Sequence, residues 1–119
     1  MTAGRRSTVP ARGDVVLVPF PYAELTAAKA RPAVVLSGRE FFQAERKIVV
    51  AAITSNVSAH RGPTNLNLIR WRECGLAKPS VVTSWLATLA PDLIVLRIGA
   101  LSPDQLRGVE SCLSRTLEL

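Results

Sequence analysis

The chain has 119 residues, of which 48% are hydrophobic and 5% aromatic, and its formal net charge is +6. This length predicts one compact domain, because it is too short for two domains of ordinary size. Its apolar residues are mostly Val, Leu, Ile and Ala, and its eight prolines and seven glycines are scattered, which favours many short strands over a helix bundle.

Arginine supplies most of the positive charge. Twelve of the fifteen basic residues are arginine, whose planar guanidinium can hold a phosphate through two hydrogen bonds. Five basic residues lie between Glu45 and Glu73 with no acidic residue among them: Arg46, Lys47, Arg61, Arg70 and Arg72. This distribution indicates either a polyanionic partner or a solvated basic face.

The cysteines and the single histidine exclude several kinds of site. Cys74 and Cys112 are far apart and His60 is the only imidazole, so we expect neither a zinc site nor a disulfide framework, and two-histidine ribonuclease chemistry is excluded. Residues 1–6 precede no apolar segment long enough for a signal peptide, and no apolar run is long enough to span a membrane. We therefore expect a cytoplasmic protein without a membrane anchor.

Residues 1–12 lack periodicity and contain Arg5 and Arg6, so we expect a flexible basic arm ahead of a single domain over residues 13–119. Short apolar runs bounded by Gly, Pro and polar residues predict the strands of that domain. The predicted strands span residues 15–18, 33–37, 47–54, 65–68, 81–89 and 94–101, of which 81–89 is one bent strand or two short ones. Residues 38–45 and 69–75 are predicted as short helices or turns.

The C-terminal segment has a strong helix start. Ser102 is a predicted N-cap, Pro103 takes the first helical position, Asp104 favours the positive end of the helix dipole, and Gln105 completes a capping box. The predicted helix runs towards Leu119. Its apolar stripe, against the barrel or a partner subunit, consists of Leu106, Val109, Leu113 and Leu117.

Two strand ends carry the polar groups most suited to chemistry. Arg31 stands before Pro32 at the start of an apolar strand, and the apolar strand 47–54 ends at Thr54 and Ser55. Common catalytic motifs and a glycine-rich phosphate loop are missing. Basic and hydroxyl side chains can nevertheless stabilise the charge of a pentavalent phosphate, and RNA supplies its own nucleophile, the 2′-hydroxyl.

Two further side chains have open interpretations. Phe20 precedes a loop with charged residues, where it could stack a nucleobase or cap the end of the barrel. His60 lies in a polar loop and is more readily explained as a solvent-exposed histidine than as a catalytic base.

Five segments in order resemble the signature blocks of the MazF/PemK toxins: residues 13–21, 29–37, 51–55, 75–82 and 98–102. The resemblance implies a mainly β, single-domain SH3-like barrel of antiparallel strands with a C-terminal α-helix, forming a homodimer. It also implies a sequence-specific endoribonuclease that needs no metal or cofactor and is neutralised by a cognate antitoxin. Such enzymes cleave single-stranded RNA to 2′,3′-cyclic phosphate and 5′-hydroxyl ends, and thereby inhibit translation and growth.

The resemblance places the catalytic residues of the family on Arg31 and Thr54. We expect Arg31 to clamp the charge that develops on the phosphorane and Thr54 to hydrogen-bond a non-bridging oxygen. The residues expected to contact RNA around them are Phe20, Glu24, Lys29, Ser55, Asn56, Arg61, Lys78 and Ser80.

The chain departs from the family pattern in two places. Residues 22–29 lack the Glu-Gln-x-Gly pattern, and Thr83-Ser84-Trp85 replaces a basic residue followed by aspartate. The 2′-hydroxyl would therefore lose its proton to water or to Glu24. Two other functions stay open: a non-catalytic relative that binds nucleic acid or a peptide, and a gyrase poison like CcdB, whose Trp-Gly-x-Ile-like ending is absent here.

Overall fold

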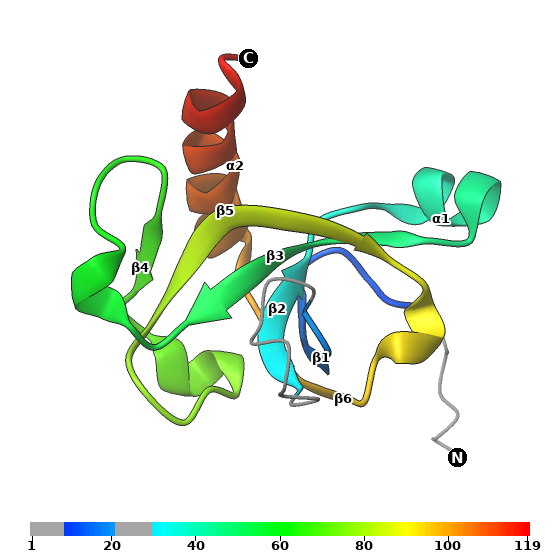
Figure 1. Ribbon diagram of the computed structural model, residues 1–119, viewed down its shortest axis with the longest axis horizontal. Helices are drawn as coiled ribbons and strands as arrows, with labels where there is room; N and C mark the ends of the chain where they lie inside the picture. The colour runs from blue at the N-terminus through cyan, green and yellow to red at the C-terminus, as the bar shows by residue number, and fades with distance from the viewer. Residues whose placement is uncertain (1–8, 21–29) are drawn as a thin grey trace.

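The computed structural model describes residues 9–20 and 30–119, which form a strongly curved antiparallel sheet with helix α2 at one end (Figure 1). In chain order the elements are β1 (Asp14–Val18), β2 (Arg31–Val35), α1 (Arg39–Glu45), β3 (Ile48–Thr54), η1 (Val57–Ala59), β4 (Leu66–Leu68), η2 (Trp71–Cys74), β5 (Ser80–Leu89), η3 (Pro91–Leu93), β6 (Leu96–Ala100) and α2 (Pro103–Leu117). The predicted mainly β fold with a C-terminal helix is confirmed.

The six strands have the order β4-β5-β3-β2-β1-β6, and every neighbouring pair is antiparallel. Residues 81–89 belong to one strand rather than two, and the pairing of β5 with β3 contains a register shift. The last strand starts two residues later than predicted, at Leu96, and the Ile94 N–H still closes the 3-10 turn η3 on the Pro91 carbonyl at 3.1 Å.

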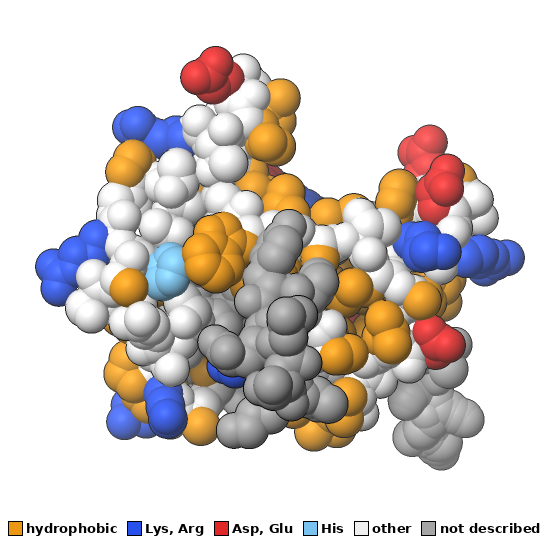
Figure 2. Space-filling view, viewed as in Figure 1, with side chains coloured by type: hydrophobic (Ala, Val, Ile, Leu, Met, Phe, Trp, Pro, Cys, Tyr) orange, Lys and Arg blue, Asp and Glu red, His pale blue; other side chains and the backbone are white. Residues whose placement is uncertain are grey.

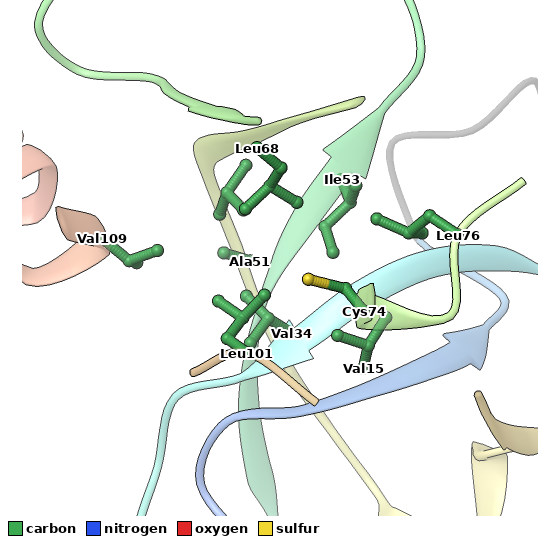
Figure 3. Packing of buried hydrophobic residues seen from close by; sticks show 10 residues of the cluster. Val15, Val34, Ala51, Ile53, Leu68, Cys74, Leu76, Leu101 and Val109 are labelled. Atoms are coloured by element: carbon green, nitrogen blue, oxygen red, sulfur yellow. The ribbon is translucent and has the colours of Figure 1, made fainter. Parts of the chain in front are cut away.

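The sheet separates two hydrophobic clusters, because successive side chains of a strand point to opposite faces. Val15, Val34 and Ala51 belong to the first cluster, which α2 covers through Val109 (Figure 3). Val16 and Val50 belong to the second cluster. Continuous β-branched runs form strands that are buried on both faces, which explains the apolar segments of β1 and β3.

Cys74 brings η2 into the first cluster, where Figure 3 shows its sulfur beside apolar side chains of the sheet. Both Cys74 and Cys112 are free thiols and buried. Burial raises the pKa of each thiol, since a thiolate would lose its hydration in these surroundings. Both side chains therefore act as small hydrophobic groups at neutral pH.

The start of α2 is held by the predicted capping box. The Gln105 N–H donates to Ser102 Oγ at 3.2 Å, and the Ser102 N–H donates to Gln105 Oε1 at 2.8 Å. We expect Ser102→Ala to lower the free energy of unfolding by about 1 kcal/mol, because the Gln105 N–H in the first turn loses its acceptor, Ser102 Oγ. Thermal or urea denaturation measures the loss. Ser111→Ala, at an exposed position within α2, is the matched control and should change stability by less than about 0.5 kcal/mol.

The predicted apolar stripe of α2 meets the sheet over only part of its length. Val109 is buried in the first cluster, and Leu106 and Leu113 pack against it. Leu117, however, is 52% exposed, because α2 rises away from the sheet towards its C-terminal end (Figure 1).

The N-terminal arm, predicted over residues 1–12, is described only from residue 9 onward. Arg12 donates to the Leu36 carbonyl and forms an ion pair with Glu110 of α2, and the Ala11 N–H donates to Asp14. Residues 11 and 12 are thus attached to the domain. No helix within residues 9–20 and 30–119 is long and apolar enough to cross a membrane.

Candidate nucleic-acid interface

A pocket of about 600 Å³ is lined by the start of β2, the end of β3 and the first half of β5. Its described lining residues are Phe20, Arg31, Pro32, Ala52, Ile53, Thr54, Ser55, Asn56, His60, Leu76, Ala77, Lys78, Ser80, Thr83 and Trp85. Figure 2 shows the histidine next to a compact hydrophobic group on one face of the molecule. The pocket thus combines polar strand ends with aromatic rings.

The strand register explains why Arg31 and Thr54 share this pocket. Strands β2 and β3 pair through Ala33 and Ala52, and continuing this register by two residues places Arg31 opposite Thr54. Pro32 has no N–H to donate to a ladder, and the pairing with β3 ends at the next residue, Ala33. The two strands therefore part where these functional side chains begin, while β1 still pairs with Arg31.

Arg31 carries a guanidinium that no described residue engages. The side chain is exposed and has no ion-pair or hydrogen-bond partner within the described residues. The other arginine within a described strand is Arg97 on the edge strand β6, and the Asp14 carboxylate engages it at 2.9 Å. No described residue therefore competes with an anion for the five N–H donors of Arg31.

Thr54 keeps a proton to donate. Its Oγ1 accepts a hydrogen bond from the Asn56 N–H at 3.1 Å, which fixes the start of the following loop. Accepting this bond leaves the hydroxyl proton available, because a hydroxyl has one donor and two acceptor positions. Arg31 and Thr54 therefore both offer donors, the combination that an oxyanion requires.

The other residues predicted to contact RNA fall into three groups. Ser55, Asn56 and Lys78 are exposed and line the pocket. Phe20 and Ser80 also line it but are buried: Phe20 is 5% exposed and packs in the second cluster, and the Ser80 hydroxyl donates to the Lys78 carbonyl at 2.8 Å. The structure thus uses Phe20 for packing, the second of the two interpretations left open by the sequence.

The third group lies away from the pocket or beyond the described part of the chain. Arg61 is exposed but is not among the pocket-lining residues. Glu24 and Lys29 lie outside the described residues.

The charge of the pocket favours an anion. Arg31 and Lys78 line it, and no carboxylate stands among its described lining residues. Within residues 9–20 and 30–119, no three His, Cys, Asp or Glu side chains gather as metal ligands. The chemistry that this lining can support is therefore the binding of a phosphate and the stabilisation of added negative charge.

Sequence reasoning missed three contributors to the pocket. His60 is half-buried rather than solvent-exposed, and its ring lies edge-on to Trp85 with the centroids 5.1 Å apart. Thr83 is buried, and its hydroxyl donates to the Ala52 carbonyl at 2.8 Å. The sequence does place a polar residue, Thr83, after two valines of a predicted buried strand. Its hydrogen-bond partner, the Ala52 carbonyl, is known only from the fold.

A family model of the PemK-like, MazF-like toxins of type II toxin-antitoxin systems matches residues 11–117. The chain belongs to this family. The match contains Arg31, Thr54 and the whole described sheet, so the family resemblance seen in the sequence is confirmed. No curated protein matches the sequence of this MazF-like chain significantly.

Solved structures of an endoribonuclease and of MazF toxins share the fold of this family member. A mycobacterial endoribonuclease in complex with its cognate antitoxin has a TM-score of 0.75 at 20% identity, covering 93% of this chain and 97% of that chain. MazF in a MazE-MazF structure from Deinococcus radiodurans has a TM-score of 0.71 at 21% identity, covering 93% and 97%. The Mycobacterium tuberculosis toxin MazF-mt6 has a TM-score of 0.68 at 24% identity, covering 89% and 97%.

Proposed function

We propose that this MazF-like chain is a sequence-specific endoribonuclease that cleaves single-stranded RNA without a metal ion. The observation that carries the proposal is that Arg31 and Thr54 line one pocket, just beyond the last paired residues of β2 and β3, and that the Arg31 side chain has no partner within the described residues. Solved neighbours described as endoribonucleases support the same reaction class.

The proposed reaction is an internal transesterification of the RNA backbone. The 2′-hydroxyl attacks the adjacent phosphorus, the bond from phosphorus to the 5′-oxygen breaks, and the products are a 2′,3′-cyclic phosphate and a 5′-hydroxyl. The transition state adds negative charge to the non-bridging oxygens. Arg31 would clamp these oxygens and Thr54 would donate to one of them, so both stabilise the charge as it develops.

Two proton transfers complete the reaction. The 2′-hydroxyl loses its proton to water or to Glu24, because no carboxylate stands among the described residues lining the pocket. The departing 5′-oxygen takes up a proton. Arg31 can supply it directly or through a water, since an alkoxide is a stronger base than a neutral guanidine.

The proposed cellular role is that of a cytoplasmic toxin acting on mRNA as a homodimer. A cognate antitoxin would inhibit it with an amphipathic, partly acidic segment that covers Arg31, because the pocket is lined by cations. Solved neighbours that include antitoxin complexes support this partner class.

A cleavage assay tests the proposal. The purified chain, incubated with a long single-stranded RNA in the presence of EDTA, should produce discrete fragments. Binding without fragments would instead favour a non-catalytic relative. Growth arrest with intact mRNA and damaged DNA would favour a gyrase poison.

A further inference from the structure

We propose that Thr83 is a positioning residue for RNA cleavage, whose buried hydroxyl fixes the strand ends that carry Arg31 and Thr54. This inference rests on the proposed function and adds to it a residue that acts through the backbone rather than on the phosphate. The backbone group concerned is the Ala52 carbonyl, to which the Thr83 hydroxyl donates.

The hydrogen bonds of Thr83 leave it no proton for a ligand. The side chain is only 2% exposed although it belongs to the lining of the pocket. Its hydroxyl donates to the Ala52 carbonyl at 2.8 Å and accepts from the Trp85 N–H at 3.1 Å. Because a hydroxyl has a single proton to donate, this proton is used within the protein. Any effect of Thr83 on cleavage therefore passes through the strands that it joins.

A β-bulge interrupts the pairing of β5 with β3 at this point. The register shifts between Ala51 and Ile53, so residues 83–85 of β5 lie opposite the single residue Ala52. Strand β5 bends part-way along its length (Figure 1), as bulged strands do, and bulges are frequent beside active sites. Thr83 bonds to backbone groups of both strands across the bulge, which fixes the position of one strand relative to the other.

The short ladder beyond the bulge carries Thr54. Past Ala52, β3 forms two more pairs with β5, and the last of them joins Thr54 to Val81. The bulge separates these two pairs from the regular ladder of the two strands. The Thr83 hydroxyl bonds at the junction, so it helps to fix the end of β3 from which Thr54 reaches the pocket.

The same position in the sheet also precedes Arg31. Ala52 pairs with Ala33 of β2, and the pairing of these two strands ends there on the side of the pocket. Arg31 lies two residues before Ala33, and Thr54 lies two residues after Ala52. A shift of the Ala52 backbone would therefore reach both strand ends. A misplacement of about 1 Å in a catalytic arrangement can cost about a hundredfold in rate.

Steady-state cleavage kinetics test the inference. Thr83→Val keeps the shape of the side chain and removes the hydroxyl, so we expect kcat to fall by about 10- to 100-fold while KM stays within about twofold. The cations that would bind RNA are still present in this variant. Thr83→Ser retains the hydroxyl and should recover most of the lost kcat. Thr83→Cys, whose thiol is a weak donor, is the second variant if Thr83→Val does not fold, and it should show a similar loss.

Two controls on β3 distinguish positioning from a general loss of stability. Ser37→Ala removes a hydroxyl that accepts from the Val49 N–H at 2.8 Å, near the other end of β3 and outside the lining of the pocket. Ile48→Val removes a buried methyl group from the second cluster. At a temperature where thermal unfolding shows every variant to be folded, both controls should keep the kcat of the unaltered chain.

Backbone NMR signals provide a measurement that needs no RNA. The Asn56 N–H donates to Thr54 Oγ1 at 3.1 Å, so its signal reports on the end of β3. We expect Thr83→Val to move the amide signals of Thr54 and Asn56, and Ser37→Ala to leave them in place.

The outcomes separate this inference from the proposed function. If the unaltered chain did not cleave RNA, the endoribonuclease would be contradicted, whereas moved Thr54 and Asn56 signals in Thr83→Val would still support the positioning role. Unmoved signals would overturn that role. An unchanged kcat in Thr83→Val, or an equal loss in Thr83→Val and Thr83→Ser, would also overturn it, because the hydroxyl would then have no part in cleavage.

Discussion

Arg31→Ala should reduce the rate of RNA cleavage by at least about 10²–10³-fold while leaving the fold intact. The guanidinium is exposed and has no partner within the described residues, so its removal breaks no structural contact there. Its loss instead removes the guanidinium with which the pocket would bind the phosphate of RNA. Cleavage rates of a defined RNA, measured together with thermal unfolding, check both parts of this expectation.

Arg61→Ala is the matched control for this prediction. Arg61 is also exposed and carries the same charge, but it is not among the residues that line the pocket. Its removal should weaken RNA binding only slightly and leave the maximal rate close to that of the unaltered chain. A folded Arg31→Ala chain that cleaves RNA as fast as the unaltered chain would contradict the catalytic role of Arg31. An equal loss of cleavage rate in Arg31→Ala and Arg61→Ala would mean that any positive charge has the same effect.

Gly99→Ala should destabilise the domain by about 3 kcal/mol, because β6 crosses η2 with backbone against backbone. A Cβ at Gly99 would lie 2.1 Å from the Cys74 carbonyl oxygen, and a Cβ at Gly75 would lie 1.9 Å from the Ile98 carbonyl oxygen. Both oxygens belong to the backbone, so they cannot move away as the end of a flexible side chain can. The variant must separate η2 from β6 and thereby disturb the packing of Cys74 in the first cluster.

Gly38→Ala provides the control, since a Cβ there would have no neighbour within 4 Å. Its cost should stay near or below about 1 kcal/mol, the size of an N-cap effect at the start of α1. Urea denaturation of the two variants measures the difference. A Gly99→Ala chain as stable as Gly38→Ala would mean that the close approach of η2 and β6 contributes nothing to stability.

The fold was predictable from local patterns to a large extent. Apolar runs identified all six strands, and Ser102 with Gln105 identified the start of α2, because these signals depend on neighbouring residues. The bulge in β5 was not predictable. It arises because residues 83–85 of β5 lie opposite the single residue Ala52 of β3, some 30 positions earlier in the chain. Sequence periodicity contains no information about which residues of two distant strands lie opposite each other.

The site was predictable in part for the same reason. Arg31 and Thr54 stand at strand ends that the sequence marks with Pro32 and Ser55, and the register then places the two strand ends together. The pairing of His60 with Trp85 depends on how the loop after η1 folds back onto β5. The burial of Phe20 could not be predicted either, because an aromatic side chain close to charged residues in the sequence can face solvent or pack in a core. Phe20 packs in the second cluster.

The most direct test of the proposed function is whether RNA supplies its own nucleophile. An oligonucleotide cleaved by the purified chain in EDTA should be compared with one that lacks the 2′-hydroxyl only at the nucleotide before the cleaved bond. We expect the first to give a 2′,3′-cyclic phosphate and a 5′-hydroxyl, and the second to stay intact at that bond. Cleavage of both at similar rates, or products with 5′-phosphate ends, would contradict the reaction assigned to Arg31 and Thr54.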